Sequence, residues 1–167
     1  MAKRQVFYSF HYKNDVMRAA QIRNIGAIEG NTPVSANEWE EVIKKGDAAI
    51  KKWIDDNMRN RSCVIVLVGS ETANRDWIKY EIEKAWKDEK GIFGIYIHNV
   101  KCPNNGKSAQ GVNPFEQIPV TKGKGIKCYN PSSFDAYNDI RNNIEKWIED
   151  AIKEQEMNAV IKKIFRM

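Results

Sequence analysis

The run "SCVIVLVG" at residues 62–69 constrains the fold more than any other stretch of the chain. It is continuous, apolar and rich in β-branched residues, which indicates a strand buried on both faces, as in a parallel sheet. Similar runs occur at 5–10 ("QVFYSF") and 91–100 ("GIFGIYIHNV"), with shorter ones at 27–30 and 126–130. Helical patterns separate these runs. The alternation predicts an α/β fold, with a parallel sheet of about five strands covered by helices on both faces.

Four helices are predicted from apolar residues at helical spacing. The first covers 15–26, and the second begins at Ser35 or Asn37, with a kink or break at Gly46. A third begins near residue 74, and the last begins at Ser132 or Ser133. One side of the last helix carries Phe134, Tyr137, Ile140, Ile144, Trp147, Ile148, Ala151 and Ile152. The final residues, "NAVIKKIFRM", either extend that helix or pack separately on the domain, and separate binding to a partner or membrane is less favoured.

Residues 101–125 hold much of the Gly, Pro and Asn of the chain and predict a long, mobile excursion. The "KGKG" at 122–125 lacks the full phosphate-loop pattern, so we interpret it as a flexible turn. With 167 residues, the chain suits a single domain, with a core at about 1–130 and a C-terminal helical part at 131–167.

Charge and cysteine content exclude several classes of function. The net charge is +5, but acidic residues are interleaved with Lys and Arg, so no nucleic-acid surface is expected. Three widely spaced cysteines fit neither a disulfide framework nor a zinc site, and the two histidines are far apart in sequence. We therefore expect a cytoplasmic protein without a metal. No stretch approaches the length needed to span a membrane, so no membrane partner is expected.

Glu81 is the candidate functional residue of the third helix. Glu81 lies about 40° from Trp77 around the helix and about 100° from Ile82, at 3.6 residues per turn. It therefore shares with Trp77 a shoulder beside the stripe that faces the sheet. That stripe consists of Ile78, Ile82, Ala85 and Trp86. Position alone favours a solvated charge for such a glutamate.

Several motifs resemble those of TIR (Toll/interleukin receptor-like) domains. "VFYSF" followed by "HYKND" resembles their first box, and Ser70, Trp77 and Glu81 stand at the Ser-x6-Trp-x3-Glu spacing of their catalytic helix. "KRQVFYSFHY", "NEWEEVIKKGDAAIKKWI", "GSETANRDWIKYEI" and "NPF" together resemble the TIR-like proteins of Thoeris anti-phage systems, over about residues 3–116. The usual BB-loop signature is not found, and "GNTPVSANEWEEV" stands in its place, so the assembly geometry of ordinary TIR domains is not carried over to this chain.

The resemblance implies a flavodoxin-like TIR fold that cleaves NAD between nicotinamide and ribose. In the Thoeris branch, it implies a cyclic ADP-ribose isomer that signals to a separate effector protein, with NAD as substrate and no bound cofactor. Glu81 would be catalytic, with Trp77 supporting it. The substrate would be bound by Phe7, Ser9, His11, Trp39, Ser70 and Trp77. Several TIR enzymes assemble to complete their sites, so a homo-oligomer activated on assembly or by a trigger is also implied.

Carboxylate chemistry is consistent with this role. Departure of nicotinamide leaves positive charge on the ribose, which a nearby carboxylate stabilises. Capture by water gives ADP-ribose, and capture by an adenosine hydroxyl or adenine nitrogen gives a cyclic product; the sequence leaves both open. A non-enzymatic TIR-like adaptor is the main alternative, and a deoxyribosyl transferase is a more distant one. A response-regulator receiver is set aside because "VIVLVGS" lacks the required aspartate.

Overall fold

The computed structural model describes residues 4–25, 41–102 and 106–166. Four parallel strands form one sheet in the order β1-β2-β3-β4. They are β1 (Val6–Ser9), β2 (Cys63–Val68), β3 (Gly91–Tyr96) and β4 (Cys128–Tyr129). Val6 pairs with Cys63, and Cys63 pairs with Gly91, so the three longer strands begin at one level of the sheet. The predicted flavodoxin-like α/β class is confirmed; the strand predicted at 27–30 lies outside the described residues.

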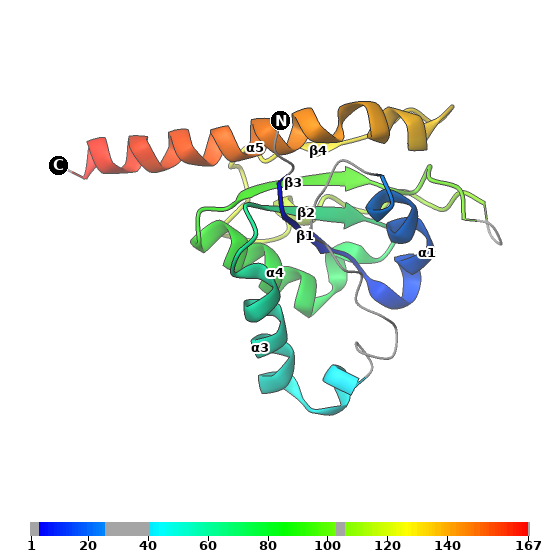
Figure 1. Ribbon diagram of the computed structural model, residues 1–167, viewed down its shortest axis with the longest axis horizontal. Coiled ribbons are helices and arrows are strands. Elements are labelled where there is room, and N and C mark those ends of the chain that lie inside the picture. Colours follow the sequence, from blue (N-terminus) through cyan, green and yellow to red (C-terminus); the bar gives the residue numbers. More distant parts are fainter. Residues whose placement is uncertain (1–3, 26–40, 103–105, 167) are drawn as a thin grey trace.

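Helices cover both faces of this sheet (Figure 1). Helices α1 (Tyr12–Arg23) and α5 (Ala136–Phe165) pack on one face, and α3 (Asp47–Met58) and α4 (Asp76–Lys87) pack on the other. Alternate β2 residues serve the two layers, because Cys63, Ile65 and Leu67 join the first core while Val64, Val66 and Val68 join the second. The continuous apolar character of β2 therefore reflects burial on both faces, as its sequence predicted.

Gly46 breaks the second predicted helix, as expected from the sequence. Residues 41–44 are helical, and α3 begins again at Asp47. Between them Gly46 has a φ of 96°, in the left-handed region that disfavours side chains. The turn at 41–45 and α3 are thus two separate rigid pieces joined at one glycine.

Gly69 and Gly111 allow three segments to meet closely beyond β2. A Cβ atom on Gly69 would lie 2.2 Å from Asp15 Oδ2, and a Cβ on Gly111 would lie 2.0 Å from the Gly69 carbonyl oxygen. The same region is held by the Thr72 hydroxyl, which accepts a hydrogen bond of 2.7 Å from the Gly69 amide. The loop after β2, the start of α1 and the segment around 111 form one tightly packed block, which we call the glycine block.

Within the segment 101–125, the described residues from 106 onward differ from the mobile excursion that the sequence predicted. Its short 3-10 helix, η2 (Pro114–Glu116), places Phe115 in the core with no exposed surface. The Asn113 side chain caps this turn, and the Thr121 hydroxyl donates a 2.7 Å hydrogen bond to the Phe115 carbonyl. Ile118 and Thr121 are also buried. Local Gly and Pro content suggested a loop without showing that one aromatic side chain anchors it.

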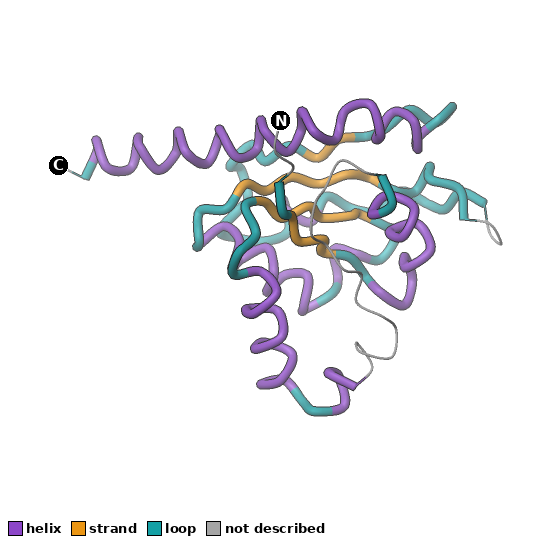
Figure 2. Tube along the Cα trace, viewed as in Figure 1, coloured by secondary structure: helices purple, strands orange, loops and turns teal. Residues whose placement is uncertain are grey.

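Helix α5 is the longest element and extends beyond the sheet (Figure 2). It begins after Asp135, whose side chain accepts a hydrogen bond from the Asn138 amide, rather than at Ser132 or Ser133. Phe134, predicted on the buried side, is 98% exposed because it precedes the helix. The segment "NAVIKKIFRM" extends α5 as far as Phe165 and does not pack separately. Among the described residues, none of the helices has both the length and the apolar character needed to cross a bilayer.

Candidate active site

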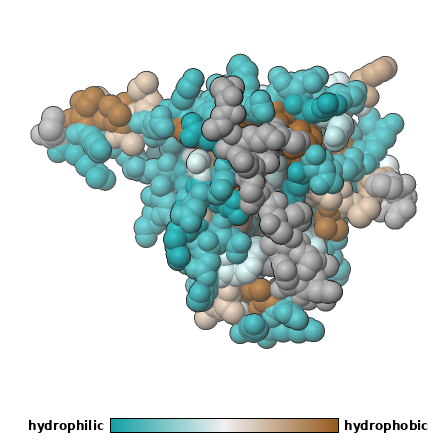
Figure 3. Space-filling model, viewed as in Figure 1, coloured by the Kyte–Doolittle hydropathy of each residue, from teal (hydrophilic) through white to brown (hydrophobic). Residues whose placement is uncertain are grey.

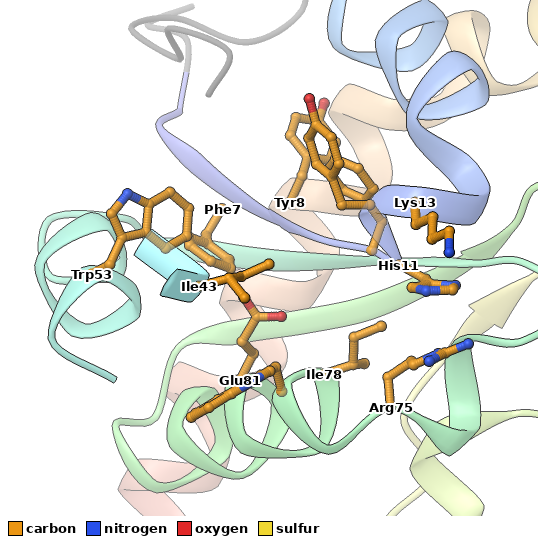
Figure 4. A pocket seen from close by; sticks show the side chains of 12 residues that line it. Phe7, Tyr8, His11, Lys13, Ile43, Trp53, Arg75, Ile78 and Glu81 are labelled. Atoms are coloured by element: carbon orange, nitrogen blue, oxygen red, sulfur yellow. The ribbon is translucent and has the colours of Figure 1, made fainter. Parts of the chain in front are cut away.

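A pocket of about 280 Å³ opens beside the carboxyl end of β1, between α3 and α4. Its position follows from the parallel sheet, because loops at the carboxyl ends of strands leave a crevice there. Figure 4 shows side chains from β1, the turn at 41–45, α3 and α4 converging on it. Glu81 lies in the pocket between an aromatic wall and a group of cationic side chains.

Glu81 is a buried carboxyl group with a hydrogen-bond donor beside it. Helix α4 directs it inward together with Ile78, Ile82 and Ala85, and its exposed fraction is 6%. The Ser9 hydroxyl, itself fully buried at the end of β1, donates a 2.7 Å hydrogen bond to Glu81 Oε1. Burial raises the pKa of Glu81 to about 8, and the hydrogen bond from Ser9 opposes that rise. A carboxyl group with a raised pKa inside a pocket is typical of functional sites.

Aromatic side chains form the wall on one side of Glu81. The Phe7 ring from β1 meets Trp53 of α3 edge to face, with centroids 6.4 Å apart. Trp77, one turn before Glu81, lines the pocket and packs edge to face against Tyr80 at 5.9 Å. Such a wall suits a flat aromatic ring.

Cationic side chains lie toward the other end of the pocket. His11, Lys13 and Arg75 all line it, and Figure 4 shows them on the side away from Trp53 and Phe7. Arg75 is held by Glu71, with 3.3 Å between Nη2 and Oε2. Burial lowers the pKa of His11, and the charge of Arg75 lowers it further, so His11 is neutral at pH 7. The two fixed positive charges that line this end therefore belong to Lys13 and Arg75, with the Glu71 carboxylate beside Arg75.

The structure brings together most of the predicted site residues. Phe7, His11, Trp77 and Glu81 line the pocket, and Ser9 lies behind Glu81. Ser70 is exposed and lies outside this pocket, where it accepts a 3.3 Å hydrogen bond from Asn14. Its binding role stays a prediction, and Trp39 lies outside the described residues.

Sequence reasoning missed Trp53, Lys13 and Arg75. Trp53 stands at the apolar spacing of α3, which fits a core-facing residue equally well. Lys13 and Arg75 stand two residues after His11 and two before Trp77, inside the motifs already singled out. Their proximity to those motifs was the available signal. Within the described part of the chain, no three His, Cys, Asp or Glu side chains are grouped so as to hold a metal ion.

A flavodoxin-like sheet with a buried carboxyl group in a strand-end pocket defines a class of α/β proteins that place ligands at this edge. The family model described as "Thoeris protein ThsB, TIR-like domain" matches residues 7–102. The chain belongs to this family, as the resemblance predicted. A relative from Bacillus cereus (strain MSX-D12), named "Putative cyclic ADP-D-ribose synthase ThsB1", is 35% identical over 137 residues, covering 77% of this chain and 71% of the relative.

Proposed function

We propose that this protein cleaves the nicotinamide–ribose bond of NAD and forms a cyclic ADP-ribose isomer that activates a separate effector protein in anti-phage immunity. The observation that carries the proposal is the Glu81 carboxyl group, buried in a pocket between an aromatic wall and two fixed cations. The family, and the name of the Bacillus cereus relative, support the choice of NAD as substrate and of a cyclic product. The reaction would take place in the cytosol, with NAD as substrate rather than as bound cofactor.

The pocket matches the charge distribution of NAD. The nicotinamide ring of NAD is flat and cationic. It fits between the Glu81 carboxyl group and the wall that carries Trp53 and Trp77. The diphosphate is anionic and fits the Lys13 and Arg75 end. A cation beside Glu81 favours the ionised carboxylate, so substrate binding lowers the pKa of Glu81 in the complex.

Bond cleavage then follows from this placement. The C1′–N bond breaks with its electron pair on the nicotinamide nitrogen, which leaves as a neutral ring and so needs no acid. Positive charge develops on the ribose, next to the ionised Glu81. An adenosine hydroxyl or adenine nitrogen attacks C1′ to close the cyclic product, and a hydroxyl releases its proton in that step. Attack by water instead gives linear ADP-ribose.

Incubation with NAD, followed by chromatography with mass detection, tests the proposal. We expect release of nicotinamide together with a cyclic ADP-ribose product whose mass is lower than that of linear ADP-ribose by one water. Because the family resemblance implies activation on assembly, the reaction is run at high protein concentration and with a crowding agent. If no nicotinamide appears under any of these conditions, the protein is better described as a non-enzymatic TIR-like adaptor.

Replacing Arg75 with Gln is expected to raise the KM for NAD about tenfold with little change in kcat, because the substrate loses a charged contact to its diphosphate. Steady-state kinetics at low and high salt measure this, and the difference from wild type shrinks as salt rises. Lys79→Gln, at an exposed position of α4 outside the pocket, is the matched control. An unchanged KM in Arg75→Gln would place the diphosphate elsewhere.

Replacing Ser9 with Ala is expected to shift the pH profile of kcat/KM to higher pH. That profile should rise with pH as free Glu81 ionises, with a midpoint near its pKa of about 8. The Ser9 hydrogen bond lowers that pKa, so its loss moves the midpoint upward. Ser62→Ala, at the opposite end of the sheet, should leave the profile unchanged. A Ser9 variant with lower activity but the same midpoint would assign Ser9 a merely structural role.

A further inference from the structure

The last turns of α5 carry a row of exposed apolar side chains. We call residues 156–166 the α5 tip; its apolar residues are Met157, Val160, Ile161, Ile164 and Phe165, all exposed. Their spacing of three and four places them on one side of the helix, which we call the tip stripe. Figure 3 shows apolar side chains gathered at the end of α5 that projects from the domain. Such a contiguous apolar surface is typical of an interaction site.

The tip stripe faces away from the sheet of its own chain. With 100° per residue, its centre lies about 170° around the helix from the row formed by Ile144, Ile148 and Ile152. That second row is buried against the sheet. Lys162, on the sheet side of the tip, confirms the orientation, because its Nζ lies 4.0 Å from Glu89 Oε1 and 6.0 Å from the Trp86 ring centroid. The stripe is therefore a separate apolar face and does not continue the core-facing row.

Charges beside the stripe favour a second copy of the same helix as its occupant. Glu156 and Lys163 are both exposed and lie two turns apart on the same flank of the stripe. When two such helices pack antiparallel with the axis between Ala159 and Val160, Glu156 of each copy faces Lys163 of the other. A two-fold axis makes both ion pairs identical. A parallel arrangement brings opposite flanks together and loses this match.

We propose that the α5 tip is a dimerisation surface that joins two copies of this chain antiparallel about a two-fold axis. The buried stripe is short, so the interface belongs to the small, weak class and the dimer forms in the micromolar range. The tip projects from the end of the sheet opposite the carboxyl ends of the strands (Figure 1). Both pockets therefore stay open in the dimer.

Sedimentation velocity across the micromolar range tests this proposal. We expect wild type to pass from monomer to dimer with rising concentration, and Ile161→Glu to stay monomeric, because it places a charge in the stripe. Arg141→Glu, an exposed charge reversal of the same helix before the tip, should dimerise as wild type does. Helicity and melting temperature, measured by circular dichroism, confirm that each variant is folded.

Charge-reversal variants test the antiparallel geometry. Glu156→Lys and Lys163→Glu should each weaken dimerisation, because each places like charges opposite one another across the axis. An equimolar mixture of the two variants should form a heterodimer, since both facing pairs then regain opposite charge. The double variant should dimerise as wild type does. The proposal is overturned if wild type stays monomeric, or if the mixture dimerises no more strongly than either variant alone. It is also overturned if the protein binds phosphatidylserine vesicles while remaining monomeric.

Discussion

Replacing Glu81 with Gln is expected to reduce NAD cleavage on the order of 10³-fold or more, because the amide has the shape of the carboxylate without its charge. Release of nicotinamide, followed by chromatography, measures the loss. Glu83→Gln is the matched control, since Glu83 is exposed on the same helix. If Glu81→Gln turns over NAD at the wild-type rate, the assignment of Glu81 as the catalytic residue is wrong.

The same variant is expected to be more stable than wild type at alkaline pH. The pKa of Glu81 is about 8 in the folded protein and near 4.5 in the unfolded chain, so the folded state binds the proton more tightly. This tighter proton binding adds to the free energy of unfolding of wild type. The contribution is fully present below pH 4.5 and is lost as the pH rises to 8, by up to about 1.4 kcal/mol per pH unit. Gln does not titrate, so the gap in melting temperature should widen over this range.

The combination of lower activity and higher stability separates a functional carboxyl group from a structural one. A structural glutamate would lose stability when its hydrogen bond to Ser9 is altered, and Glu81→Gln would then melt at a lower temperature at every pH. Thermal unfolding at pH 5 and pH 8, with Glu83→Gln in parallel, makes this comparison. A destabilised Glu81→Gln at pH 8 would contradict the expected cost of the buried charge.

Replacing Phe115 with Ala is expected to lower the free energy of unfolding by about 3–5 kcal/mol. Its ring is fully buried in the core that α3 and α4 cover, and Gly94 of β3 leaves room for it, since a Cβ there would lie 3.0 Å from Phe115 Cε2. Removing the ring leaves a cavity that the sheet is too rigid to close. Urea unfolding measures the change.

Phe134→Ala is the control for this prediction. The Phe134 side chain is 98% exposed, so its removal should change the free energy of unfolding by less than about 0.5 kcal/mol. The sequence suggested the reverse order of importance, with Phe134 in the core and Phe115 in a mobile segment. A Phe115→Ala variant that unfolds like wild type would restore the interpretation of 101–125 as a loose excursion.

The sequence predicted the sheet well because burial on both faces leaves a continuous apolar run, as in β2. It also predicted the break at Gly46 from local backbone chemistry. Helical geometry placed Glu81 only on the shoulder beside the buried stripe, and the structure buries it there. It failed where a contact joins distant segments. Nothing near Phe115 indicates that Gly94 makes space for its ring.

The pocket residues were likewise predicted where they lie in local motifs and missed where packing between distant segments places them. Phe7, Trp77 and Glu81 lie in recognisable motifs, and the structure places them around one cavity. Trp53 follows an apolar periodicity that fits the core equally well, so only the packing of α3 against β1 shows that it reaches the pocket. Ser70 ends up exposed because the chain turns into the 3-10 helix η1 (Thr72–Asn74) directly after it. Motif spacing fixes position along the chain and leaves the direction of that turn undetermined.

The glycine block lies beside the α1 end of the pocket, where the Asp15 amide donates a hydrogen bond to the His11 carbonyl oxygen. Gly69 meets the buried Asp15 side chain and Gly111 meets the Gly69 backbone, so that region is closely packed and resists deformation. On the other side, Ile43 enters the pocket from the turn at 41–45, which joins α3 through Gly46, a glycine with open space around it. In the proposed reaction, substrates of different size would therefore be accommodated mainly at this one wall. We therefore expect substitutions in residues 41–45 to change the substrate range, while Glu81 and the carboxyl end of β1 keep their positions.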